Sequence, residues 1–253
     1  MKVKQRQNKI IDIIRHKKHV TVEDLATSLD ISRETIRRDL SDLGKQNKIQ
    51  KVHGGATLPC IISESSFQQR MVKNAKGKAR IADVASTLFL AGETLFIDTG
   101  STTLYFAEKL AEKSGLTIIT NSVEIAKTIA ATNHHQTFLL GGEFSLNNHQ
   151  TVGTMVTSQV RLFRAHHAVL TIGALDERTG AMDFDIEEAQ VAHAMIEQAQ
   201  SLTLLVDSSK FNQIASFEVC SYSQVNRVVC DKQPPKNLYD LMLAQGIEVI
   251  IAP

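Results

Sequence analysis

The sequence predicts an α/β protein of two domains, a small basic helical domain followed by a larger domain built on a mostly parallel sheet. Residues 1–60 hold 13 of the chain's 28 Lys and Arg but only 7 of its 27 Asp and Glu, although the whole chain has a formal charge of only +1. Beyond about residue 76, short apolar runs rich in β-formers alternate with helical segments, which is typical of a sheet covered by helices. We therefore expect a module that meets a polyanion, joined to a body with a different task.

In the first domain, apolar residues recur at helical spacing in three segments separated by short gaps. The first segment places Ile10, Ile13 and Ile14 on one face. The second opens on Thr21, three residues before Asp24, which is the spacing of a capping box. The third begins at Ser32, a residue type favoured as a helix N-cap. The expected inward residues of the second and third helices are Leu25, Ala26, Leu29, Ile36, Leu40 and Leu43.

The third segment, ISRETIRRDL, carries three arginines within six positions. If Ile36 and Leu40 face the core, Arg33 and Arg37 share the solvent face, because residues four apart are neighbours on a helix. Two helices joined by a short turn form a helix-turn-helix, whose second helix enters the DNA major groove, where arginine binds guanine edges or phosphates. The alternative is a solvated charged face whose arginines pair with nearby carboxylates.

The third helix is followed by NKIQKVHGGATLP, in which Ile49 and Val52 precede Gly54 and Gly55. This pattern predicts two short strands around a tight turn, and a plain linker turn is the alternative. Lysines such as Lys48 would then lie beside the DNA backbone. The residues expected to contact DNA are Ser32, Arg33, Thr35, Arg37, Arg38, Lys51 and His53.

We expect the DNA-binding domain over 1–57, a linker over 58–75 and a second domain over 76–253, which binds an effector and forms oligomers. The second domain contains seven apolar runs, separated by stretches long enough for crossover helices or loops, and this predicts a largely parallel sheet. The runs are 94–98, 116–120, 136–140, 168–172, 202–206, 227–231 and 248–252.

Small and polar residues follow several of these runs, and ligands of such sheets bind at the carboxyl ends of the strands. The first run leads into Thr99 and the small residues after it, and then into a helix, which favours an anion cradle of N–H groups and hydroxyls. Lys210 supplies a cation for a phosphate, and Asp98 or Glu188 can accept hydrogen bonds from sugar hydroxyls. Ordinary turn chemistry is the alternative at each position. The expected effector-binding residues are Asp98, Gly100, Ser101, Thr102, Thr103, Asn121, Gly142, Glu188 and Lys210.

Other classes of site receive little support from the sequence. The three cysteines are far apart, which indicates neither a disulfide framework nor a zinc site. The adjacent pairs His134–His135 and His166–His167 lack the spacing of a metal motif. We expect no metal and no cofactor. No apolar run is long enough to span a membrane and the N-terminus is polar, so we expect a cytoplasmic protein without a membrane partner.

The stretch TVEDLATSLDISRETIRRDLSDLGKQNKIQKVHGGA resembles, almost position for position, the N-terminal signature of the DeoR family of bacterial transcription regulators. The resemblance implies a winged helix-turn-helix whose recognition helix begins at Ser32. The motifs FIDTGSTT, LLGGE, GALD, DFDIEEA and VDSSKF resemble the family's effector domain. That domain is similar in fold to ribose-5-phosphate isomerase and typically senses a phosphorylated sugar or sugar derivative. The chain departs from the family at Ala192 and His193, where many members carry a Lys-Arg pair.

The sequence thus favours a sequence-specific transcriptional regulator, a repressor of a carbohydrate-metabolism operon controlled by a phosphorylated sugar effector. Its expected partner is double-stranded operator DNA, and because operators are commonly palindromic we expect a homodimer or homotetramer. The alternative function is a sugar-phosphate isomerase, with Asp98, Glu188 and Lys210 as its chemical groups. We expect a regulator rather than an enzyme, because no feature of the sequence shows that these groups converge on a substrate carbon.

Overall fold

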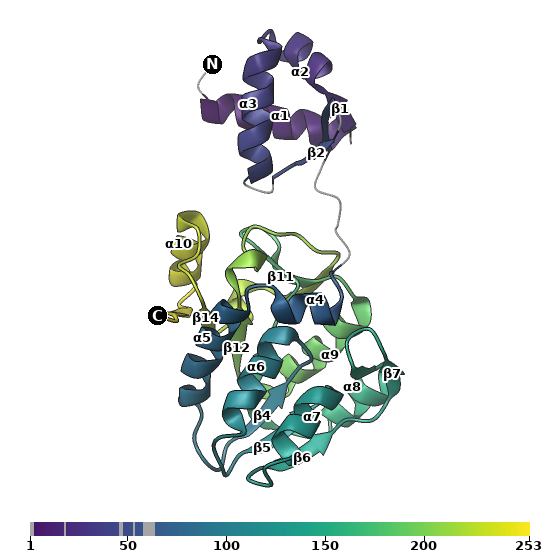
Figure 1. Cartoon of the computed structure of the whole chain (residues 1–253), viewed down its shortest axis with the longest axis vertical. Coiled ribbons are helices and arrows are strands. Elements are labelled where there is room, and N and C mark those ends of the chain that lie inside the picture. The colour runs from purple at the N-terminus through teal and green to yellow at the C-terminus, as the bar shows by residue number, and fades with distance from the viewer. Residues whose placement is uncertain (1–2, 18, 46–47, 53, 58–63) are drawn as a thin grey trace. The chain divides into compact units, whose positions relative to one another are not determined.

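The computed structural model describes residues 3–17, 19–45, 48–52, 54–57 and 64–253. The chain divides into two compact units, Met1–Ile62 and Ser63–Pro253 (Figure 1). Part of the segment expected as a linker, residues 58–63, lies outside the described residues. The remainder of that segment belongs to the second unit and includes the helix α4, Phe67–Val72.

The first unit contains the three predicted helices and a three-stranded antiparallel sheet. Helix α2 begins with a complete capping box, in which Asp24 N–H donates to Thr21 Oγ1 at 3.0 Å and Thr21 N–H donates to Asp24 at 3.2 Å. One apolar face of each helix packs into a single core whose members include Ile10, Leu25 and Ile36, all fully buried. The elements are α1 (Val3–Lys17), β1 (His19–Thr21), α2 (Val22–Leu29), α3 (Arg33–Lys45), β2 (Gln50–Val52) and β3 (Gly55–Thr57).

The turn between α2 and α3 is short. Asp30 adopts a left-handed conformation with φ 53°, and Ile31 N–H donates to Ala26 O at 3.0 Å. The predicted hairpin is also present, because β2 and β3 pair antiparallel on either side of Gly54, which has φ 78°. A Cβ at Gly55 would collide with the Val20 carbonyl oxygen, so only glycine allows β3 to pair this closely with β1.

The second unit is built on a seven-stranded sheet in which every pairing is parallel. All seven apolar runs of the sequence form its strands, in the order β15-β14-β12-β9-β4-β5-β6. The mostly parallel α/β fold is therefore confirmed. The strands are β4 (Thr94–Ile97), β5 (Thr117–Thr120), β6 (Gln136–Leu139), β9 (Ala165–Leu170), β12 (Ala199–Val206), β14 (Arg227–Cys230) and β15 (Glu248–Ile251).

Helices cover both faces of this sheet, which explains why its central strands are apolar on both sides. One core joins the sheet to α5 (Ala75–Ala85), α6 (Ser101–Leu110) and α7 (Val123–Ala130), which lie side by side in Figure 1. The other core joins it to α8 (Thr154–Val160), α9 (Ile186–Glu197) and α10 (Lys236–Ala244). Short 3₁₀ turns occupy Ser86–Leu88, Ser208–Lys210 and Tyr222–Gln224.

Two small antiparallel sheets were not expected from the sequence. Strands β7 (Glu143–Ser145) and β8 (Gln150–Val152) form a hairpin. Strands β10 (Ala174–Asp176), β11 (Gly180–Asp183) and β13 (Phe217–Cys220) form the other sheet. Each of these strands has only three or four residues, too few to establish a period of two. The helices that the structure describes include none with the length and apolar character of a membrane span.

Candidate functional site

In the first unit, α3 presents its arginines to solvent. The side chains of Arg33, Arg37 and Arg38 are 63%, 66% and 78% exposed, whereas Ile36 on the opposite face is fully buried. The helix begins after Ser32, whose Oγ accepts from Thr35 N–H at 3.3 Å and lies 2.9 Å from Thr35 Oγ1. Of the five residues predicted here, Ser32 and the three arginines are therefore exposed, and Thr35 is half-buried.

These arginines have carboxylate neighbours, as the charged-face alternative requires. Arg33 contacts Glu23 of α2, and Arg37 and Arg38 lie 4.0 and 3.6 Å from Glu34. All of these side chains are more than 60% exposed, and exposed ion pairs contribute only about 0–1 kcal/mol. Phosphate groups can therefore replace the carboxylates at little cost.

A different, largely buried ion pair joins α3 to α1. Asp39 is 3% exposed and accepts from Arg6 of α1, whose Nη2 lies 3.1 Å from its Oδ1. Asp39 therefore forms its ion pair with Arg6 of α1, and not with the exposed arginines of α3. In the hairpin, Lys51 is exposed and pairs in register with Ala56, and Lys48, two residues before β2, is also exposed. The predicted contact residue His53 lies outside the described residues.

In the second unit, a cleft lies at the carboxyl ends of β4 and β5, where ligands of parallel sheets bind. Asp98 directly follows β4 and Asn121 directly follows β5. Both antiparallel sheets contribute, because Gln150 lies on β8 and Asp183 ends β11. The lining residues are Asp98, Thr99, Asn121, Gln150, Asp183, Glu188, Val191 and Ala192.

Helix α6 starts three residues after Asp98, so its first N–H groups, which have no partner within the helix, lie next to the cleft. Gly100 is its N-cap, and a Cβ at this position would collide with the Thr171 side chain. Ser101 Oγ accepts from Lys78 Nζ at 2.8 Å. Thr102 is 1% exposed, and Thr103 donates from Oγ1 to the Gly100 carbonyl at 3.2 Å.

Asn121 is almost completely buried, with 1% of its surface exposed. Its Nδ2 donates to Gln150 Oε1 and to the Thr151 carbonyl, both at 3.0 Å. Its Oδ1 has no hydrogen-bond partner among the described residues. Gly142, another predicted effector contact, is not in the cleft lining; it allows close packing against the Val152 carbonyl and Val156.

Three carboxylates of the cleft have raised pKa values. Burial raises the pKa of Asp98 well above its usual value, and its oxygens accept from Thr171 N–H at 3.1 Å. Burial and then the charge of Asp183 raise the pKa of Glu188 to about 7. Burial also raises the pKa of Asp183. Glu188 Oε1 accepts from Gln150 Nε2 at 2.6 Å.

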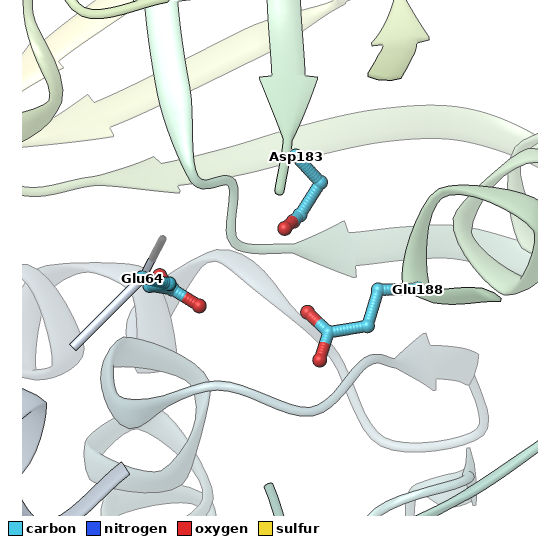
Figure 2. A group of neighbouring side chains, drawn as sticks. All are labelled: Glu64, Asp183 and Glu188. Carbon is cyan, nitrogen blue, oxygen red and sulfur yellow. The ribbon is translucent and has the colours of Figure 1, made fainter. Parts of the chain in front are cut away.

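Lys210 lies in the 3₁₀ turn after β12, and its Nζ contacts Glu64 Oε1 at 3.0 Å. Glu64 also binds the guanidinium of Arg70 from α4. Figure 2 shows that the carboxylates of Glu64, Asp183 and Glu188 point toward one another, and their nearest oxygens lie within 4.8 Å. Such a group could hold a metal ion, but Arg70 and Lys210 already bring two positive charges to it. The histidines that the structure describes join no comparable group.

Sequence reasoning missed Glu64, Arg70, Lys78, Gln150 and Asp183. The sequence predicts a linker over the segment that holds Glu64 and Arg70, and a linker gives no reason to expect ligand contacts. Lys78 is 3% exposed, and only its hydrogen bond to Ser101 shows that it lies beside the start of α6. The motif DFDIEEA contained Asp183, but nothing in its spacing distinguished it from the other acids.

Comparison with known proteins yields matches over both units. The DeoR-like helix-turn-helix domain family matches residues 6–60, and the DeoR C terminal sensor domain family matches residues 73–232. The glycerol-3-phosphate regulon repressor of Escherichia coli (strain K12) is 32% identical over 98% of this chain and 99% of its own length. The HTH-type transcriptional repressor CsqR of the same organism is 30% identical over 97% and 94%.

Among solved structures, ribose 5-phosphate isomerase A of Methanocaldococcus jannaschii is 20% identical over 54% of both chains, with a TM-score of 0.40. The named relatives are transcriptional repressors that match nearly the whole chain, and they favour a regulator over the isomerase alternative. An exposed arginine face on the second helix of a helix-turn-helix, joined to a sensor domain, agrees with that class. The chain belongs to the DeoR family of DNA-binding transcriptional regulators.

Proposed function

We propose that this regulator binds operator DNA through α3 and the β2–β3 hairpin, and that a phosphorylated sugar or sugar derivative in the cleft alters this binding. It acts as a repressor of genes of carbohydrate metabolism, in the cytoplasm where bacterial DNA lies. The name of one relative, the glycerol-3-phosphate regulon repressor, supports a phosphorylated effector.

The DNA-binding half of the proposal rests on the exposed face of α3. Arg33, Arg37 and Arg38 can reach guanine edges or phosphates, since arginine provides a rigid fork of donors. Thr35, near the first turn, can contact a phosphate or a base edge. Lys51 and Lys48 on the hairpin side would neutralise the DNA backbone, which makes the binding sensitive to salt.

The single observation that carries the effector half is the buried Oδ1 of Asn121, which lacks a partner in the described part of the chain. A buried acceptor without a hydrogen bond is costly, and a ligand that donates one removes that cost. The neighbouring acceptors Asp98, Asp183 and Glu188 suit the same kind of ligand, because hydroxyl groups donate to carboxylates. The cleft therefore favours a molecule with several hydroxyls.

The phosphate of such a ligand has a suitable place at the start of α6. Helix N-termini attract anions through their free N–H groups and the helix dipole. Lys78 adds a buried ammonium group beside Ser101, and burial lowers its pKa to about 8. Ala192 is part of the lining and His193 is exposed, so position 192 contributes no charge to ligand binding.

We further propose that two copies of the chain associate, because a palindromic operator requires two recognition helices. Exposed apolar side chains support an interface near β6, β7 and α8, where the Phe138 and Phe163 rings lie 5.2 Å apart and Gln159 of α8 bonds the Gly141 carbonyl at 2.7 Å. The exposed residues are Phe138, Leu139, Phe144, Leu146, Met155 and Leu162.

A thermal-shift screen of sugar phosphates, each beside its unphosphorylated parent sugar, tests the effector half. A ligand present at a hundredfold excess over its dissociation constant should stabilise the chain by about 2.7 kcal/mol. We expect a shift with a phosphorylated compound and none with the parent sugar. Equal shifts with both, or no shift with any sugar phosphate, would contradict the proposal.

A further inference from the structure

The carboxylate of Glu64 lies between two cations of the second unit. Its Oε1 is 3.0 Å from Lys210 Nζ, and its Oε2 binds Nη1 of Arg70. The three side chains are only 16%, 17% and 10% exposed, so this is a largely buried cluster rather than a surface ion pair. Glu64 comes from the start of the unit and Lys210 from the turn after β12, so the contact joins distant parts of the sequence.

Arg70 is held in position independently of Glu64. Its Nη2 donates to Asn148 Oδ1 at 2.5 Å, and its guanidinium lies 5.6 Å from the centre of the Phe67 ring. Its buried Nε has no hydrogen-bond partner in the part of the chain that the structure describes. The guanidinium is therefore a preorganised donor with unused capacity for an anion.

Glu64 is at the same time crowded by negative charge. Its carboxylate, together with those of Asp183 and Glu188, forms the group whose oxygens lie within 4.8 Å (Figure 2). At and above the Glu188 pKa of about 7 these like charges repel, which offsets part of the attraction of Glu64 to Arg70 and Lys210. Another anion can therefore replace the Glu64 carboxylate between Arg70 and Lys210.

This cluster adjoins the effector cleft. Asp183 and Glu188 line the cleft, and Lys78 connects the cluster to α6, because its Nζ donates both to the Arg70 carbonyl and to Ser101 Oγ. An anionic group at the start of α6 would approach the same set of cations.

We propose that Arg70 and Lys210 form an anion-binding subsite, which the chain's own Glu64 carboxylate fills without ligand and which the phosphate group of the effector takes over. The inference rests on the proposed function and names the contact that ligand binding breaks. Glu64 is the first described residue after the stretch that leads from the DNA-binding unit. Its release therefore frees the first described residue of the second unit from Arg70 and Lys210, which gives the ligand a way to alter DNA binding.

The test uses the full chain with inorganic phosphate as the probe, at constant ionic strength balanced with chloride. Glu64→Gln keeps the shape of the side chain and removes the competing charge. Its dissociation constant for phosphate, measured by calorimetry, should fall about tenfold, in the range set by charge-assisted hydrogen bonds. Glu218→Gln is the matched control, since Glu218 is an exposed carboxylate on β13, and it should bind phosphate as the unaltered chain does.

Two further variants keep the test decisive if Glu64→Gln alters the fold. Glu64→Asp retains a shorter acid and should give an affinity between those of Glu64→Gln and the unaltered chain. Lys210→Ala removes part of the subsite and should weaken phosphate binding. Equal phosphate affinity in the unaltered chain and the folded Glu64 variants would overturn the inference.

Operator binding supplies the second readout. Without ligand, Glu64→Gln should shift the affinity for an operator fragment in the direction in which a sugar phosphate shifts the unaltered chain. The inference fails and the proposed function stands if a sugar phosphate changes operator binding of the unaltered chain and Glu64→Gln behaves identically. Identical behaviour means the same operator affinity without ligand and the same change when the sugar phosphate is added. If no sugar phosphate binds the unaltered chain, the proposed function fails as well.

Discussion

Glu188→Gln should stabilise the protein at neutral and higher pH. The carboxyl group of Glu188 is buried beside Asp183, and burial followed by that neighbouring charge raises its pKa from 4.5 to about 7. Glutamine resembles the protonated acid, and its amide oxygen can still accept from Gln150 and Asn148, which bind Glu188 Oε1. The substitution therefore removes a charge that the site disfavours while retaining the acceptor.

The magnitude follows from proton linkage. Between pH 4.5 and about 7 the native state holds a proton on Glu188 that the unfolded state has lost, so the free energy of unfolding falls as the pH rises. Each pKa unit corresponds to about 1.36 kcal/mol, which gives a loss of about 3 kcal/mol above pH 7. Below pH 4.5 both states are protonated and the loss disappears. Glutamine does not titrate, so the variant avoids this loss.

Urea unfolding at a series of pH values from 4 to 8 measures the effect. The difference in unfolding free energy between Glu188→Gln and the unaltered chain should be smallest at pH 4 and grow by about 3 kcal/mol toward pH 8. Glu218→Gln makes the same substitution at an exposed position and should show a small difference with little pH dependence. A difference for Glu188→Gln that does not change with pH would mean that the native state does not raise the pKa of Glu188.

Three further substitutions test separate parts of the structure. Arg37→Ala should weaken operator binding by about 1–3 kcal/mol and lower the salt slope by about one, with an unchanged thermal midpoint; unchanged affinity in a gel-shift titration would remove Arg37 from the interface. Gly100→Ala should destabilise the second unit by about 1–3 kcal/mol in urea unfolding, because the new Cβ collides with Thr171, and unaltered stability would contradict that contact. Thr21→Ala removes the cap of α2 and should cost about 1 kcal/mol. Faster hydrogen exchange of the α2 amides would show this, and equal exchange would speak against the capping box.

The elements that the sequence predicts well are those with strong local signals. Thr21 and Asp24 carry their capping box in adjacent sequence, and the stripe from Ile36 to Leu43 has helical period, so α2 and α3 follow from local physics. The strands of the parallel sheet are apolar runs, and for the central strands the reason is that helices cover both faces of the sheet. The three-residue strands β7 and β8 have no such pattern.

The sequence places residues of the cleft together most directly where chain direction decides their position. Asp98 and Asn121 follow neighbouring parallel strands, so their proximity follows from the fold. Glu64 and Lys210 are 146 positions apart, and their contact depends on how the segment around α4 packs on the second unit. No local pattern encodes such a contact, and the polar composition of that segment favoured a linker. Asp183 ends the four-residue strand β11, which is too short to be predicted from the sequence, so its place in the cleft could not be predicted either.

We propose above that a ligand in the cleft of the second unit controls DNA binding by α3. The most direct measurement is the operator affinity of the unaltered chain and of Thr102→Val, each with and without the sugar phosphate found by the thermal-shift screen. Thr102 lies buried in the first turn of α6, and valine keeps its shape without the hydroxyl. We predict that the ligand changes the affinity of the unaltered chain by about 5- to 150-fold, while Thr102→Val keeps its ligand-free affinity and responds far less. An equal response in both proteins would contradict the claim.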